Sequence, residues 1–176
     1  MPYAPDVSSR TFFHRLGTVR EEGELPDYTP AIYGSLLTTT IVAVQWRHDA
    51  AADLIALSVV ISVVVFWLTH VWAEIVNHRV HHELTRSEVA NLAGDEAPML
   101  LAVLLPAGIL ALGRLVGAST DTAVGLALIV SIGQLFVWGL IVGHAARRGW
   151  RFALGVAAVD CLLGVAIVAL KVLVIH

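Results

Sequence analysis

The chain has 176 residues, of which 57% are hydrophobic and 14% are charged, and its formal net charge is −3. A soluble domain carries about a quarter charged residues, so this composition argues against a soluble globular protein. A single cysteine, Cys161, excludes an internal disulfide and a cysteine-rich metal site.

The first segment, residues 1–29, is polar and lacks the apolar core of a signal peptide, so we expect the first membrane helix to stay in the mature protein. Bulky apolar side chains alternate there with arginines, as in a helix that lies at a membrane surface. These residues are Phe12, Phe13, Leu16, Arg10, Arg15 and Arg20. We predict a cytoplasmic amphipathic segment; a solvated connector is the alternative.

Five apolar runs follow, each of about 17 residues or more, which suits a helix crossing a hydrocarbon core of roughly 30 Å. They cover residues 30–46, 50–82, 98–117, 121–145 and 151–175. We predict an all-α fold, a polytopic membrane helix bundle of five transmembrane helices that occupies residues 30–176.

Local signals mark where these helices begin and pack. Thr29, Asp49 and Ser119 are expected N-caps. Thr85 and Glu88 predict a capping box for a short extra helix that ends at Gly94. Pro106 and Gly108 are expected to break the third span. The pairs Gly113 with Gly117 and Gly139 with Gly143 favour close helix packing.

The placement of basic residues predicts the orientation. Eight fall on the side of the N-terminus: Arg10, Arg15, Arg20, Arg79, Arg86, Arg147, Arg148 and Arg151. Three fall on the other side: Arg47, Arg114 and Lys171. The N-terminus is therefore expected inside and the C-terminus outside a cell (plasma) membrane.

A stripe of titratable side chains runs along the second predicted helix. Its members His70, Glu74, His78 and His81 recur at intervals of three or four residues, so they share one face. Lipid would penalise charge there, so this face should meet protein or water.

Three interpretations of this stripe stay open. It could relay protons or ions, because histidine titrates near physiological pH. It could hold a divalent transition metal, zinc or iron, with His144 of the fourth span completing the ligands His70, Glu74, His78 and His81. It could instead be a polar face that bonds loops and lipid headgroups.

A second polar group is expected at mid-membrane depth, where Thr39, Ser62, Gln134 and Asp160 fall when the spans are aligned. An intramembrane carboxylate such as Asp160 is rare and usually marks an ion path or a binding site. The alternative is an aspartate that only joins two helices by hydrogen bonds to Thr38, Thr39 or Gln134. Serine and threonine in such helices usually bond the carbonyl one turn back.

Two stretches carry a resemblance to a known family. Residues 66–74 (FWLTHVWAE) and 162–174 (LLGVAIVALKVLV) are similar to small actinobacterial integral membrane proteins that lack an assigned function. The likeness covers the chain from Tyr33 onward, and it implies a shared membrane fold without implying an activity.

The string His78-Arg-Val-His81-His82 resembles a histidine box of membrane fatty-acid desaturases and hydroxylases. Those di-iron enzymes need several such boxes, and this chain has no second paired box, so we reject that identity.

Motifs for nucleotides and nucleic acids are missing from the sequence: there is no P-loop, no glycine-rich dinucleotide turn and no basic patch interleaved with aromatics. The lipid bilayer and further copies of the chain are the expected partners. We predict a small proton or ion channel or transporter, a homo-oligomer with Asp160, Thr39, Gln134, Ser62, His70 and Glu74 along its path. The alternatives are a metal-binding membrane protein or enzyme and a non-catalytic accessory subunit, and an enzyme is the less favoured class.

Overall fold

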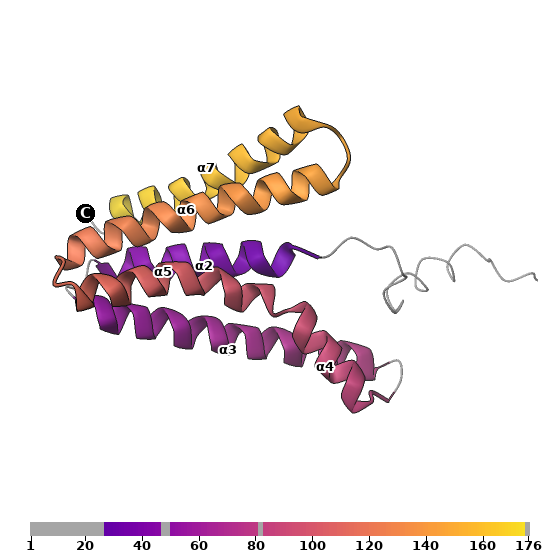
Figure 1. The fold of residues 1–176 in the computed structure, drawn as a ribbon. Coiled ribbons are helices and arrows are strands. Elements are labelled where there is room, and N and C mark those ends of the chain that lie inside the picture. Colours follow the sequence, from indigo (N-terminus) through magenta and orange to yellow (C-terminus); the bar gives the residue numbers. More distant parts are fainter. Residues whose placement is uncertain (1–26, 47–49, 81–82, 175–176) are drawn as a thin grey trace, which may run out of the picture.

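The computed structural model describes residues 27–46, 50–80 and 83–174, and of residues 171, 172 and 174 only the backbone. Six α-helices and short connections make up this part of the chain (Figure 1). They are α2 (Thr29–Trp46), α3 (Ala52–Arg79), α4 (Arg86–Asp95), α5 (Pro98–Leu115), α6 (Thr120–Ala145) and α7 (Trp150–Val174). The predicted all-helical bundle is confirmed, while the predicted N-terminal amphipathic segment lies almost wholly outside the described residues.

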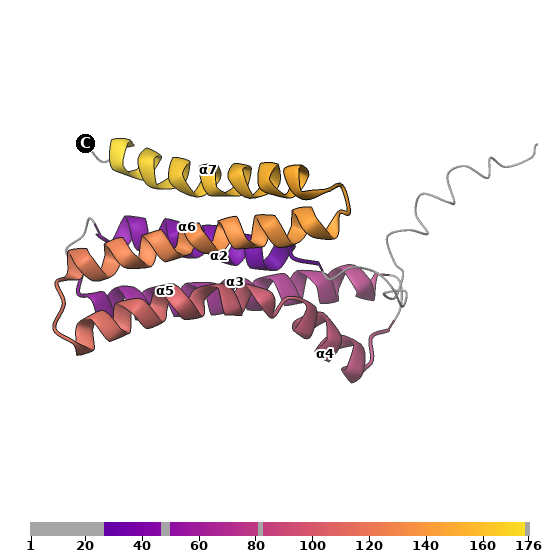
Figure 2. The same cartoon turned by 45° about the horizontal axis from the view of Figure 1, so that its top comes forward.

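The five long helices run side by side, and consecutive ones alternate in direction (Figures 1 and 2). Their ends therefore gather at two ends of the bundle. We call one the Trp46 end, where α2 finishes and α6 starts, and the other the Glu96 end, where α2 starts and α6 finishes. The short helix α4 lies at the Glu96 end.

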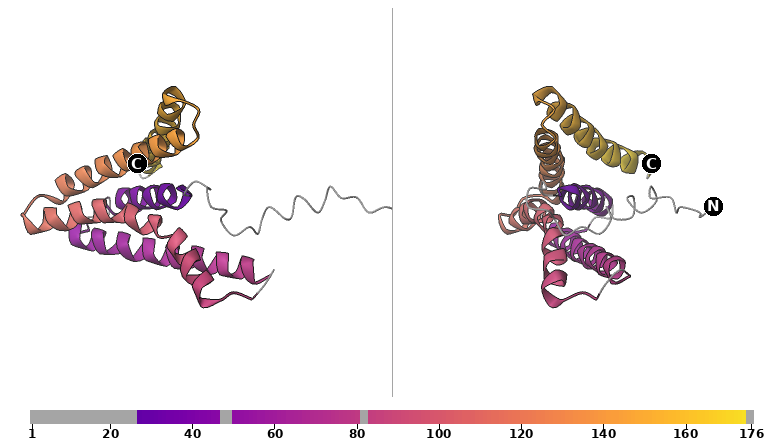
Figure 3. Two further views of the ribbon diagram at one scale, coloured as in Figure 1. Left: turned by 45° about the vertical axis from the view of Figure 1, so that its right-hand side comes forward. Right: turned by 90° about the vertical axis from the view of Figure 1, so that its right-hand side faces the viewer.

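Helix α2 is the centre of the bundle and contacts α3, α5, α6 and α7 (Figure 3). The core consists of small and branched apolar side chains of α2, α3, α5 and α6, among them Val42, Ile55, Val59, Leu110 and Val124, which are fully buried. Helix α7 packs on α6 and on α2. It is thus the most peripheral of the long helices.

Many large apolar side chains point away from the bundle, including Leu104, Ile129 and Leu162, each more than 60% exposed. Four of the described helices are long and apolar enough to cross a bilayer: α3, α5, α6 and α7 from Trp150 to Leu170. Their apolar outer faces suit lipid rather than water. The chain is a multi-pass integral membrane protein.

Helix α2 is not among those four helices, although five spans were predicted. Its 18 residues include Gly34, Ser35 and three consecutive threonines, which lower its hydropathy. Because α2 contacts four other helices, it depends less on an apolar outer face than they do. The count of five spans therefore stays a prediction.

Two predicted caps are confirmed. The side chain of Ser119 accepts a hydrogen bond from the Thr122 amide at 3.2 Å, and Thr85 forms the full capping box with Glu88. Asp49 lies outside the described residues, and the residue at the N-cap of α3 is Ala51, whose side chain makes no capping bond.

The prediction that Pro106 breaks the third span is wrong, since α5 is continuous from Pro98 to Leu115. Pro106 is fully buried among neighbouring helices. A proline removes one backbone hydrogen bond, and tight packing in a membrane bundle tolerates that loss.

Glycines permit close helix contacts. A Cβ on Gly139 would come 2.5 Å from the Cα of Ala157, and one on Gly143 would overlap the backbone of Ala153, so the predicted role of this pair is confirmed. Gly113 likewise packs on Ala123. The prediction for Gly117 is wrong: it has a positive φ of 73°, meets no packed neighbour, and serves to end α5.

Candidate functional site

Asp160 is a buried carboxylate inside a candidate span. It lies on the face of α7 that packs against α6, and it is 9% exposed. Its Oδ2 atom is so close to Gly139 that a Cβ added there would come within 2.7 Å of it. This oxygen has no hydrogen-bond partner in the described residues.

Two further buried side-chain oxygens have no hydrogen-bond partner in the described residues. Both lie on helices that contact α7. They are Thr38 Oγ1 on α2 and Gln134 Oε1 on α6. A buried polar atom without a partner costs about 1–3 kcal/mol. Atoms kept at such a cost are candidates for binding a proton, a cation or a hydrogen-bond donor.

The other hydroxyls of this region are already bonded within their own helices. Thr39 donates to the carbonyl of Ser35 at 2.8 Å, and Ser35 donates to Ala31 at 2.9 Å. Ser131 does the same with Ala127 at 2.8 Å. Thr38, rather than the predicted Thr39, is therefore the hydroxyl left free in α2. The sequence periodicity could not tell which of the two hydroxyls is free, since Thr38 and Thr39 are adjacent and both are fully buried.

The predicted site residues do not form one layer. Asp160 packs beside Gly139, and the ring centroid of Trp138 lies 6.1 Å from that of Tyr28, just before α2 begins. Thr39 lies about 15 Å further along α2 at 1.5 Å per residue. Asp160 is thus nearer the Glu96 end than Thr39. Ser62 lies on α3, which packs mainly on α2 and α5.

His70 belongs to a different interface from Asp160. Its ring centroid lies 4.7 Å from that of Phe66 and 6.2 Å from that of Tyr33. Its helix, α3, packs on α2, α4 and α5, whereas the helix of Asp160 packs on α6 and α2. The structure therefore places the two residues in separate contacts on either side of α2.

The rest of the predicted stripe follows α3 toward the Glu96 end. The Nδ1 atom of His78 lies 2.9 Å from the backbone oxygen of Glu74 and 3.7 Å from its Oε2. Trp67 donates its indole N–H to the carbonyl of Ala93 at 3.3 Å, which ties α4 to α3. His81 lies outside the described residues.

Sequence reasoning missed Glu96, which follows α4 and faces this stripe. Its Oε2 is buried without a hydrogen-bond partner. Burial raises the pKa of the Glu96 carboxyl above its ordinary value; His70 opposes that rise, and the charges of Glu74, Asp27 and Asp95 add to it. The available signal was the acidic pair Asp95-Glu96 directly before the third span.

A metal centre is not assembled in the part of the chain that the structure describes, where no three His, Cys, Asp or Glu side chains are placed to hold an ion. His144 is exposed at the end of α6. Since His81 lies outside this part, the predicted metal set stays a prediction.

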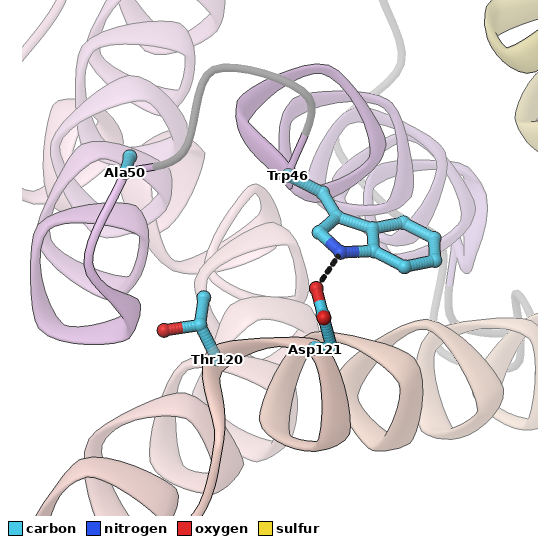
Figure 4. A pocket seen from close by; sticks show the side chains of 4 residues that line it. All are labelled: Trp46, Ala50, Thr120 and Asp121. Carbon is cyan, nitrogen blue, oxygen red and sulfur yellow. Dashed lines mark hydrogen bonds between the residues drawn. The ribbon is translucent and has the colours of Figure 1, made fainter.

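A shallow pocket opens at the Trp46 end, between Trp46, Ala50, Thr120 and Asp121 (Figure 4). Its volume of about 210 Å³ is below the range of roughly 300–1,000 Å³ typical of ligand sites. The Trp46 indole N–H donates to Asp121 Oδ1 at 2.7 Å across it. The indole N–H of Trp46 and one oxygen of Asp121 are thus already paired with each other.

No family model, curated protein or solved structure matches this chain.

Proposed function

We propose that this protein is a small channel or transporter for protons or cations, with Asp160 at the transport site. The observation that carries the proposal is the unpartnered Oδ2 of Asp160, nine-tenths buried in a candidate span. Intramembrane carboxylates of this kind usually lie on an ion or proton path.

Thr38 and Gln134 support this assignment because each keeps a buried oxygen without a partner. They sit on α2 and α6, which both contact α7. Thr38 lies nearer the Trp46 end than Asp160, so we propose that the three acceptors follow one another along the bundle, with Thr38 in place of the predicted Thr39.

His70, Glu74 and Glu96 act at the Glu96 end as a group that exchanges protons with water. Asp27 and Asp95 add negative charge to the surroundings of Glu96, which concentrates cations there. Because α2 separates His70 from Asp160, this group does not continue directly into the Asp160 contact. We propose that a homo-oligomer completes the route, since α7 is thinly covered in one chain: 17% of its span is buried, against 28–33% in α3, α5 and α6.

The membrane arrangement completes the proposal. Helix α2 is the fifth span, and the Glu96 end faces the cytoplasm, because Arg79, Arg86, Arg147, Arg148 and Arg151 gather there. The plasma membrane is the proposed location. Membership of the small actinobacterial membrane proteins stays a prediction.

The test is flux through purified chain in liposomes, comparing wild type with Asp160→Asn. Asparagine keeps the shape and removes the titratable group, so we expect at least a tenfold loss of flux at equal protein content. Asp53→Asn is the matched control, since Asp53 is exposed on α3 at the Trp46 end. Flux that is the same in wild type and Asp160→Asn, or no flux at all, contradicts the proposal.

An accessory subunit is the second candidate, and the same thin cover of α7 favours it. In that case a partner helix covers the exposed face of α7. Purification in mild detergent separates the candidates: a partner of different sequence at constant stoichiometry, together with inert liposomes, favours the accessory role.

A further inference from the structure

We infer that the species bound at Asp160 is a proton and not an alkali cation such as Na⁺ or K⁺. This inference rests on the proposed transport function and names its substrate. Three features of the Asp160 contact carry it: the supply of free oxygens, the continuity of the helices, and the cover over Oδ2.

Free side-chain oxygens are few on α2 and α6, the helices that pack on α7. The hydroxyls of Ser35, Thr39 and Ser131 each donate to a carbonyl one turn back in their own helix. Thr38 Oγ1 and Gln134 Oε1 are the two unpartnered buried oxygens that the described parts of α2 and α6 offer. An alkali cation needs a shell of several converging oxygens to replace its water, whereas a proton needs one lone pair.

Backbone carbonyls do not supply the oxygen ligands that an alkali cation would still need. Sodium sites in transporters use carbonyls from unwound stretches of broken helices. Helices α2, α6 and α7 are unbroken throughout their described lengths. The proline inside α5, Pro106, frees the carbonyl of Ala102, and α5 packs on α2, α3 and α6 rather than on Asp160.

The cover over Oδ2 also favours a proton. A Cβ on Gly139 would meet this oxygen at 2.7 Å and the Cα of Ala157 at 2.5 Å, so helix backbone closes this side of the carboxylate. A cation with part of its hydration shell would have to separate α6 from α7. A proton adds no volume of that order.

The binding step is a proton transfer to the carboxylate. A hydronium ion gives its proton to a lone pair of the Asp160 carboxylate; one O–H bond forms, and one O–H bond of hydronium breaks to leave water. The carboxyl is then neutral, which removes the cost of a charge in apolar surroundings. On release, the electron pair of the O–H bond returns to the aspartate oxygen and water takes the proton.

The experiment measures three ions in parallel on the same protein. Liposomes that contain the full chain are loaded with a pH-sensitive, a sodium-sensitive or a potassium-sensitive dye, and each is given the matching gradient. We expect proton flux that falls at least tenfold in Asp160→Asn and is unchanged in Asp53→Asn, with sodium and potassium signals equal to those of empty vesicles.

The outcomes separate the two claims. Sodium or potassium flux that depends on Asp160 overturns the proton inference and leaves the transport function standing. Absence of flux for all three ions overturns the transport function, and the inference with it.

A second measurement guards against a variant that does not fold. Infrared difference spectra of the wild-type chain between acidic and alkaline buffer should contain the C=O band of a protonated buried carboxyl. That band should be the same in sodium and in choline buffer. A band that sodium removes at constant pH overturns the inference, because the cation then competes for Asp160.

Discussion

The two ends of the bundle are held together differently. At the Trp46 end, side chains from different helices pair: Gln45 with Ser58 at 2.7 Å, Trp46 with Asp121 at 2.7 Å, and Arg114 with Asp53 at 3.9 Å. At the Glu96 end, the carboxylates of Glu74, Asp95 and Asp27 add negative charge to the surroundings of Glu96. Two of the Trp46-end contacts oppose a carboxylate to a donor, whereas Glu96 is surrounded by like charge, although arginines lie at the same end of the bundle.

From this difference we expect stability to respond to protonation more at the Glu96 end than at the Trp46 end. The Glu96 end is also held by packing, because the backbones of α6 and α7 lie close at Gly139 and Gly143. Stability at one end should therefore depend on side-chain pairs, and at the other on close packing and on pH.

The largest expected effect comes from Gly143→Ala. The new Cβ would overlap the backbone of Ala153, so α6 and α7 must separate near the Glu96 end. We expect a loss of about 1–3 kcal/mol, as for overpacking of a core. Thermal unfolding in detergent micelles measures it.

Gly133→Ala is the matched control, because Gly133 is exposed on the same helix and meets no neighbour within 4 Å. Alanine there should stabilise by up to about 1 kcal/mol through helix propensity. If Gly143→Ala and Gly133→Ala change the unfolding temperature equally, close packing of α6 on α7 does not stabilise the Glu96 end.

At the Trp46 end, Trp46→Phe keeps an aromatic ring and removes the N–H that donates to Asp121. A charge-assisted bond to an exposed carboxylate should contribute about 1 kcal/mol. A double-mutant cycle with Asp121→Ala isolates this term. Additive losses in the cycle would show that the Trp46–Asp121 pair does not stabilise this end.

Between the ends, Thr38→Val and Thr39→Val form a matched pair. Thr39→Val removes the bond to the Ser35 carbonyl and should cost about 1 kcal/mol, while Thr38→Val removes a hydroxyl that has no partner and should be neutral or stabilising. Thermal unfolding in detergent micelles measures the stability change of each variant. If Thr38→Val is instead the costlier change, its hydroxyl has a partner and our assignment of it as a free acceptor is wrong.

Sequence patterns predicted the helices well because apolar runs and caps act locally. The Thr85 capping box and the Ser119 cap depend on residues three positions apart, so they can be recognised without the fold. The uninterrupted α5 could not be foreseen, because tolerance of Pro106 depends on the helices that bury it.

The candidate site was predicted in part. Asp160 and Gln134 stand out as polar residues in apolar runs, and the structure leaves an oxygen of each buried without a partner. The depth of Asp160 relative to Thr39 depends on how far α6 and α7 slide past α2, which the Trp138–Tyr28 and Gly139 contacts set. Glu96 was missed because its burial arises from α4 folding back on α3.

The smallest expected effect is a change in pH dependence with Glu96→Gln. Burial raises the pKa of Glu96, so the folded chain binds this proton more tightly than the unfolded chain. Stability is then highest below the ordinary carboxyl pKa and falls as pH rises through the raised value. Glutamine has no proton to lose, so the variant should gain stability relative to wild type as the buffer goes from acidic to neutral.

The measurement is the unfolding temperature of wild type and of Glu96→Gln from acidic to neutral pH. The control is Glu83→Gln, because Glu83 is an exposed glutamate beyond the stripe. The difference between wild type and Glu96→Gln should follow one titration, while Glu83→Gln should give a flat difference. His70, Glu74, Asp27 and Asp95 also face Glu96, but they are present in every chain compared. A flat difference for Glu96→Gln as well would mean that the Glu96 end responds to pH no more than the Trp46 end, and the contrast between the two ends would then reduce to packing alone.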